Sequence, residues 1–260
     1  MPDGGDLSVS AVSVENREGT GPFLFVCEHA ANVFPAEFGT LGLDAPARSA
    51  HIAWDPGALG VARGLARQTD SMLVHAGVSR LIYDCNRPPQ AEGAMPSRSE
   101  IFDIPGNGAV SPSERLRRTE AIYLPFHDRL HAEIARRLAL GKPTVIVTIH
   151  SFTPVWFGKA RAVEFGVIHD ADPSLALAVV EAARATGWAA VGLNEPYSAA
   201  DGVTHTLRLH ATPYGLANVM LEIRNDLIAS PGAEAAMARR LAAILDSAAA
   251  SQRPSRRSAG

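Results

Sequence analysis

Cysteine and aromatic residues are scarce in this 260-residue chain, and its net charge is small. Its two cysteines are too few for a disulfide framework. Lys and Arg total 24 against 27 Asp and Glu, so the net charge of −3 provides no global basic field to attract nucleic acid or anionic lipid. No signal peptide or apolar run of membrane-spanning length is visible. We therefore expect a cytoplasmic protein without nucleic-acid or membrane partners, and the sequence leaves its oligomeric state open.

Apolar residues are plentiful, at 47% of the chain against 20% charged residues, which is typical of globular proteins. A chain of this length buries roughly three quarters of its unfolded surface and supports its own core. The two ends lack hydrophobic periodicity and are rich in small or charged residues. We predict a flexible segment over 1–22, a single domain over 23–250 and a disordered tail over 251–260.

Short apolar runs alternate with longer amphipathic stretches, which predicts an α/β fold with a mostly parallel sheet between two layers of helices. The predicted strands cover 23–27, 72–75, 81–83, 144–149, 165–168 and 218–223. The predicted helices cover 56–67, 113–140 (bent at Pro125), 173–186 and 233–249. The segment 88–112 is too long for a simple connection, which is typical of a lid or binding loop.

Two histidines stand where apolar strands are predicted to end. His29 follows the run 23–26, and His150 follows the run 144–149. A single histidine at such a place commonly hydrogen-bonds a loop carbonyl. Two of them at adjacent strands favour zinc, because neutral imidazole is a natural zinc ligand and ligands bind at the carboxyl ends of strands in open α/β sheets.

Asp55 lies directly before the first predicted helix, where it is either an N-terminal cap or a metal ligand. A catalytic zinc ion commonly takes three protein ligands and leaves a fourth position for water. His29, Asp55 and His150 would make that set.

Glu222 and Arg224 come late in the last predicted strand, where the alternation of side chains places them on one face. They are either a structural ion pair or functional groups. In the functional interpretation, Glu222 is a general base acting on a zinc-bound water and Arg224 binds an anion.

Arg80, Asp84, Asn86 and Arg87 precede the long loop. Arginine binds a carboxylate through two parallel hydrogen bonds, so this segment suits a small anionic substrate, although a surface ion-pair cluster explains it equally well. His127 and His131 are spaced as in the H-E-x-x-H metalloprotease motif. Asp replaces the Glu there, and the shorter side chain argues against that chemistry.

An ordered set of short motifs resembles the N-formylglutamate amidohydrolase family over about 23–226. The motifs are Glu28-His29, Trp54-Asp55, Arg80 with Asp84-Cys85-Asn86-Arg87, Tyr123-Leu124-Pro125-Phe126-His127, Ile149-His150-Ser151 and Leu221-Glu222-Ile223-Arg224. The resemblance implies a fold of the zinc-dependent exopeptidase (phosphorylase/hydrolase-like) type, with a mixed, mostly parallel sheet between helices.

The resemblance also implies site residues. The zinc ligands would be His29, Asp55 and His150, and Glu222 would be the catalytic carboxylate. Asn32 replaces a glutamate that carboxypeptidase relatives carry, so the second ligand is open between Asp55 and Glu28. A substrate with two carboxylates gives a use for several cations, so the candidate substrate-binding residues are Arg80, Asn86, Arg87, Arg224, His127 and His205. His127 matches a family motif and either orients a ligand or contacts substrate. His205 either stabilises the developing oxyanion or is an exposed loop residue.

The function so implied is zinc-dependent hydrolysis of the amide bond of an N-acyl amino acid. N-formyl-L-glutamate is the first candidate, with formate and glutamate as products and a role in histidine degradation. Two alternatives stay open. One is another zinc-dependent N-acyl-amino-acid deacylase or amidase, and the other is a non-catalytic protein that binds an anionic metabolite on the same scaffold.

Overall fold

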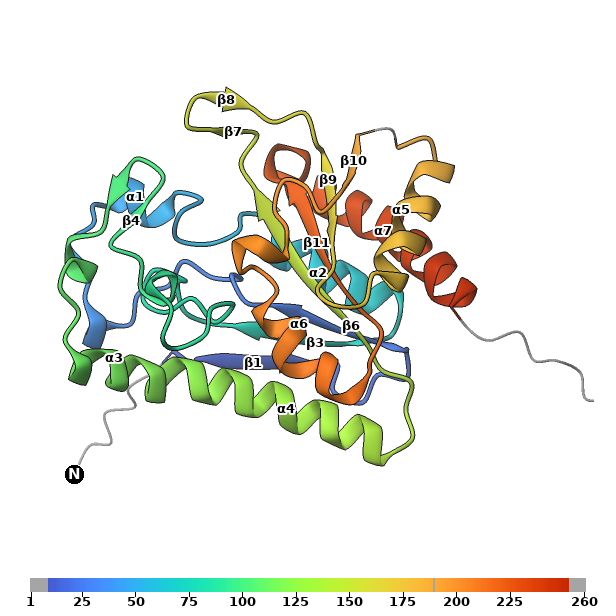
Figure 1. The fold of residues 1–260 in the computed structure, drawn as a ribbon, viewed down its shortest axis with the longest axis horizontal. Coiled ribbons are helices and arrows are strands. Elements are labelled where there is room, and N and C mark those ends of the chain that lie inside the picture. The colour runs from blue at the N-terminus through green and yellow to red at the C-terminus, as the bar shows by residue number, and fades with distance from the viewer. Residues whose placement is uncertain (1–8, 189, 253–260) are drawn as a thin grey trace, which may run out of the picture.

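The computed structural model describes residues 9–188 and 190–252, which form a seven-stranded mixed sheet with helices on both faces (Figure 1). The strand order is β1-β3-β2-β6-β11-β9-β10. The four central strands β3, β2, β6 and β11 are parallel to one another. At one edge, β1 is antiparallel to β3. At the other edge, β9 is antiparallel to β11 and parallel to β10. The prediction of a mostly parallel mixed sheet between helices is confirmed.

The strands of the main sheet are β1 (Val12–Glu15), β2 (Phe23–Cys27), β3 (Met72–Ala76), β6 (Val145–Phe152), β9 (Phe165–Ile168), β10 (Val191–Leu193) and β11 (Asn218–Arg224). Two hairpins are formed by β4 (Arg98–Ser99) with β5 (Phe102–Asp103) and by β7 (Val155–Trp156) with β8 (Lys159–Ala160). The helices are α1 (Ala45–Ser49), α2 (Ala58–Gln68), α3 (Pro112–Arg118), α4 (Leu124–Ala139), α5 (Ser174–Ala185), α6 (His205–His210) and α7 (Pro231–Ser251).

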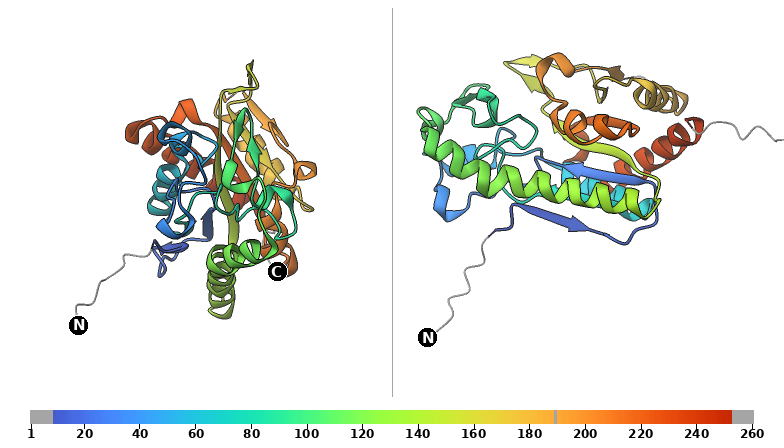
Figure 2. Two further views of the ribbon diagram at one scale, coloured as in Figure 1. Left: turned by 90° about the vertical axis from the view of Figure 1, so that its left-hand side faces the viewer. Right: turned by 60° about the horizontal axis from the view of Figure 1, so that its bottom comes forward.

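Alternate side chains of the strands enter two different cores. In β2, Phe23, Phe25 and Cys27 pack on the side of α2, α5 and α7, whereas Leu24 and Val26 pack on the side of α4 and α6. Figures 1 and 2 show these helix layers on either side of the sheet. Because strands buried on both faces need apolar residues at every position, these strands were visible in the sequence as continuous apolar runs.

Three sequence predictions are wrong in detail. Residues 12–15, predicted to be flexible, form β1 and pair with β3. Residues 81–83 are buried but form a turn, with Ile82 N–H donating to the Ser79 carbonyl. The predicted helix over 113–140 is divided by a π-helical segment, Thr119–Tyr123.

Pro125 explains that division, because proline has no N–H to donate to the preceding turn and a local change of helix type accommodates it. The strand β10 and the helices α1 and α6 are too short to give a periodic signal and were not predicted. The parts of the predicted flexible ends that cover 1–8 and 253–260 lie outside the described residues.

The carboxyl ends of β2, β6 and β11 lie side by side, because these strands are parallel neighbours. Polar side chains that follow or end these strands therefore meet at one edge of the sheet. In the described part of the chain, no helix combines the length and the apolar character needed to cross a membrane.

Candidate active site

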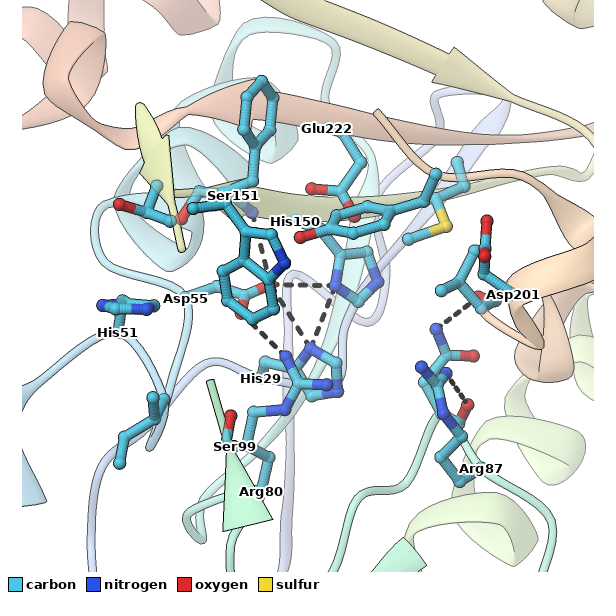
Figure 3. A pocket seen from close by; sticks show the side chains of 18 residues that line it. His29, His51, Asp55, Arg80, Arg87, Ser99, His150, Ser151, Asp201 and Glu222 are labelled. Atoms are coloured by element: carbon cyan, nitrogen blue, oxygen red, sulfur yellow. Dashed lines mark hydrogen bonds and ion pairs between the residues drawn. The ribbon is translucent and has the colours of Figure 1, made fainter. Parts of the chain in front are cut away.

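Three buried side chains from separate segments meet at this edge of the sheet (Figure 3). His29 follows β2, Asp55 precedes α2 and His150 belongs to β6. Asp55 Oδ2 lies 2.9 Å from His150 Nδ1 and 3.3 Å from His29 Nδ1, and the two Nδ1 atoms are 3.1 Å apart. One ligand atom from each residue lies within 4.8 Å of the others, a spacing at which the three side chains are able to hold a metal ion.

A second carboxylate lies on the far nitrogen of each histidine. His29 Nε2 contacts Asp84 Oδ1 at 2.7 Å, and His150 Nε2 contacts Glu28 Oε2 at 3.1 Å. Because a carboxylate only accepts, the hydrogen bond to Asp84 places a proton on His29 Nε2 and leaves the Nδ1 atom of His29 facing Asp55. Of the two candidates for the second ligand, the geometry therefore groups Asp55 with the histidines and leaves Glu28 behind His150.

The backbone holds Asp55 in this position. Its N–H donates to the His29 carbonyl (2.9 Å), and α2 begins only at Ala58. Gly57 is the N-terminal cap residue and has a φ of 80°, a conformation that favours glycine. The Asp55 side chain does not cap the helix, so its carboxylate is free to face the two histidines and to accept from Ser151 N–H (3.2 Å).

The charges in this cluster stabilise one another. Burial alone raises the pKa of Asp55, but His29 and His150 outweigh it and hold that pKa well below its usual range. Burial raises the pKa of Asp84 as well, and Arg80 and then His29 lower it far more. The pKa of His150 is raised well above its usual range, because Glu28 and Asp55 outweigh the lowering effect of burial.

The donor set fits a divalent transition metal. Two imidazole nitrogens and a carboxylate oxygen whose lone pairs face one another at 2.9–3.3 Å repel unless a proton or a cation lies among them. Nitrogen and carboxylate ligands in a set of three are typical of catalytic zinc, and carboxylates on the outer histidine nitrogens are typical of its surroundings.

Glu222 lies beside this group on the neighbouring strand, where its register partner in β6 is His150. It is buried, and its Oε2 has no hydrogen-bond partner within the described residues. Burial raises the pKa of Glu222 to about 7, and Asp55 adds to that effect. A carboxyl group with this pKa takes up and releases a proton near neutral pH, as a general acid-base requires.

A pocket of about 290 Å³ opens onto these groups. Its wall combines the metal-ligand candidates with Glu222, cationic, polar, aromatic and aliphatic residues; the remaining lining residues are His51, Ile52, Arg80, Asn86, Arg87, Ser99, Ser151, Phe152, Thr153, Trp156, Tyr197, Asp201, Val203 and Met220. In Figure 3, Arg87 and Asp201 lie on one side of the metal-ligand group and His51 on the other.

The arginine motif contributes to the pocket in two ways. Arg80 contacts Asp84 Oδ2 (2.6 Å) and Asp55 Oδ1 (3.4 Å), so its charge is committed to carboxylates of the cluster. Arg87 donates from its Nη1 nitrogen to the carbonyls of Asn86 and Gly202, both at 2.9 Å. The other donors of Arg87 have no such contact in the described structure and are available to a ligand.

Asn86 lines the pocket but is itself held at both ends of its amide. Its Nδ2 donates to the Val203 carbonyl (2.5 Å), and its Oδ1 accepts from Thr206 N–H (3.1 Å). Asn86 thereby fixes the loop that carries Arg87 to the segment before α6.

Three sequence-predicted substrate residues do not line the pocket. Arg224 contacts Asp226 (2.8 Å) and Glu164 (3.6 Å), and not Glu222, the partner that the ion-pair alternative gave it. His127 is buried between the Cys85 carbonyl (2.9 Å) and His210 (2.8 Å). His205 contacts the Tyr123 hydroxyl at 2.9 Å.

Sequence reasoning gave no role to two kinds of site residue. Asp84, which contacts His29, lies inside the arginine motif, and its spacing from Arg80 and Asn86 was the available signal. The aromatic wall of Phe152 and Tyr197 comes from segments far apart in the chain, and nothing in the sequence brings them together.

Comparisons with known proteins identify the family of the chain and structures of similar fold. The family model described as N-formylglutamate amidohydrolase matches residues 21–229. The gene product Atu2144 from Agrobacterium tumefaciens is 53% identical, with a TM-score of 0.91 over 93% of this chain and 96% of that one. The N-formylglutamate amidohydrolase from Ralstonia eutropha JMP134 is 20% identical, with a TM-score of 0.62 over 93% and 98%, which shows a shared fold. No curated protein matches the chain.

Proposed function

Because the chain belongs to the N-formylglutamate amidohydrolase family, we propose that it is a zinc-dependent amidohydrolase of N-acyl amino acids, with N-formyl-L-glutamate as its substrate. The observation that carries the proposal is the facing set of His29, Asp55 and His150 with Glu222 next to it in the sheet. A binding protein needs no buried carboxyl group of pKa about 7 beside a metal-ligand set, so Glu222 argues against a non-catalytic role.

The chemistry needs a water nucleophile, a proton carrier and a site for the substrate. His29, Asp55 and His150 would hold a zinc ion, which would lower the pKa of a water to about 7 and polarise the scissile carbonyl. The Glu222 carboxylate accepts the proton of the attacking water and then delivers it to the amine nitrogen as the C–N bond breaks. Water is consumed, and formate and glutamate leave.

Arg87 binds a substrate carboxylate in this proposal. Its position is fixed by hydrogen bonds to two carbonyls, so a ligand does not pay for ordering the side chain. Arg80 acts indirectly, because its guanidinium is already paired with Asp55 and Asp84 and holds those carboxylates in place.

The proposal is tested by formate release from N-formyl-L-glutamate by zinc-loaded protein and by its Glu222→Gln variant. The variant keeps the shape of the side chain and removes the base, so we expect unchanged zinc stoichiometry and a turnover at least 100-fold lower. His150→Ala is expected to lose stoichiometric zinc. Unchanged turnover by Glu222→Gln would contradict the assignment of the base.

A panel of N-acetyl and N-carbamoyl derivatives distinguishes N-formylglutamate hydrolysis from another N-acyl-amino-acid deacylase. The acyl group that gives the highest kcat/KM identifies the enzyme, and binding of these compounds without any hydrolysis would favour the non-catalytic alternative.

A further inference from the structure

Two buried histidines lie behind the segment 84–87. His127, on α4, contacts the Cys85 carbonyl with Nε2 at 2.9 Å and His210 Nε2 with Nδ1 at 2.8 Å. Both histidines are buried, and neither of them lines the pocket. The contact that links this pair to the site is therefore the one with the backbone at Cys85.

The hydrogen-bond partners fix which nitrogen of each ring carries the proton. A carbonyl only accepts, so His127 Nε2–H donates to Cys85, and Nδ1 is left as the acceptor for His210 Nε2–H. His210 Nδ1 has no hydrogen-bond partner within the described residues. Burial lowers the pKa of His127 to about 4 and that of His210 to about 3, so both rings are neutral near pH 7, as this arrangement requires.

The Cys85 carbonyl depends on this one donor. In the part of the chain that the structure describes, it accepts a hydrogen bond from His127 alone. Cys85 is 1% exposed, so water has no access to replace that bond. A buried carbonyl without a donor is costly, and the peptide would have to turn or shift if the N–H of His127 were removed.

The same peptide unit supports the metal-ligand group on its other side. Its carbonyl belongs to Cys85 and its N–H to Asn86, and the two groups are held in one plane. Asn86 N–H donates to Asp84 Oδ1 at 2.9 Å, and this oxygen also accepts from His29 Nε2–H at 2.7 Å. A turn of the peptide that follows loss of the His127 contact would therefore displace the carboxylate that orients His29.

A continuous series of hydrogen bonds thus leads from His210 through His127, the Cys85-Asn86 peptide and Asp84 to His29. We propose that His127 is a positioning residue of the metal site, which acts through this peptide to hold Asp84 against His29. The proposal rests on the proposed function for the presence of zinc, but not on the identity of the substrate. It also decides between the two roles that the family motif left open for His127.

The test is the zinc affinity of metal-free protein, measured by competition against a chelator. His127→Phe keeps a ring of similar size but has no N–H, so the Kd for zinc should rise about 2- to 10-fold, the range for one lost hydrogen bond. His127→Gln offers one donor and one acceptor, as neutral imidazole does, and should restore most of the affinity. The control is His131→Phe, one turn further along α4, where an exposed histidine contacts only the Tyr214 hydroxyl; it should bind zinc like the wild type.

A double-mutant cycle shows whether the effect passes through Asp84. In Asp84→Ala protein the carboxylate that the peptide holds is gone, so adding His127→Phe should weaken zinc binding no further. The same loss in both backgrounds would overturn the proposal. So would wild-type zinc affinity of folded His127→Phe protein, because His127 would then only be part of the core.

A measurement on the wild-type protein covers the case in which a variant does not fold. Nitrogen NMR of the imidazole rings distinguishes the two neutral tautomers. A proton on Nε2 of His127 supports the proposal, and a proton on Nδ1 overturns it, because Nε2 then has nothing to donate to Cys85. Zinc binding without any hydrolysis of N-formyl-L-glutamate would contradict the proposed function alone and leave the results for His127 decisive.

Discussion

Asp84 is the residue through which support of the metal site is most directly measured. Its Oδ1 accepts from His29 Nε2–H (2.7 Å) and from Asn86 N–H (2.9 Å), and its Oδ2 accepts from Arg80 (2.6 Å). Asp84→Asn keeps the size of the side chain but leaves one acceptor oxygen and removes the charge. Whichever way the amide turns, at least one contact becomes donor against donor: that with Arg80, or those with His29 and Asn86.

If the amide nitrogen faces Arg80, His29 keeps an acceptor oxygen but loses the carboxylate charge beside it, and the amide N–H groups oppose those of Arg80. If it faces His29, Nε2 must accept, and the imidazole proton moves to Nδ1, the nitrogen that faces Asp55. Loss of such a supporting contact typically weakens metal binding 10- to 100-fold. This corresponds to about 1.4–2.7 kcal/mol of binding free energy.

The assay is competition for zinc against a chelator of known affinity, with metal-free protein. Asp70→Asn is the matched control, because Asp70 caps Thr20 and Asn16 on an exposed turn. We expect the control to bind zinc like the wild type. Asp84→Asn protein that is folded, as judged by thermal unfolding, and binds zinc as tightly as the wild type would refute the reasoning.

Three other predictions concern stability and substrate binding. Burial lowers the pKa of His127 to about 4 and that of His210 to about 3, so between pH 6.5 and about pH 4 only the unfolded state takes up their protons. As the pH falls through this range, metal-free protein should lose about 1.4 kcal/mol of unfolding free energy per histidine and pH unit. His210→Phe should reduce this pH dependence in urea titrations, and an unchanged dependence would exclude the two histidines as its source. Gly57→Ala places a Cβ 2.5 Å from the Ile228 carbonyl oxygen at a residue with a φ of 80°. The substitution should lower the free energy of unfolding in urea by about 1–3 kcal/mol and weaken zinc binding. Wild-type values for both would show that the turn tolerates a side chain. Arg87→Met should raise KM for N-formyl-L-glutamate about 10- to 100-fold with a smaller change in kcat, and an unaltered KM would remove Arg87 from the substrate site.

The sequence predicted those parts of the site that depend on local patterns. The apolar runs ending in His29 and His150 predicted two strands, and both histidines now face one another at their carboxyl ends. The identity of the second metal ligand was open between Asp55 and Glu28, because both are acidic and lie close to the end of a predicted strand or helix. Only the folded chain shows that Glu28 contacts the outer nitrogen of His150.

Side chains that depend on distant contacts were not predictable. Alternation placed Arg224 on the same face as Glu222, but β11 ends at Arg224 and its guanidinium contacts Asp226 and Glu164 instead of the pocket.

The central claim is that hydrolysis depends on one metal ion held by His29, Asp55 and His150. Its most direct test is a titration of metal-free protein with zinc while formate release from N-formyl-L-glutamate is followed. We predict that activity rises from background in proportion to added zinc and reaches a plateau at one equivalent per chain. Full activity before any metal is added, or a rate that zinc does not change, would contradict the account.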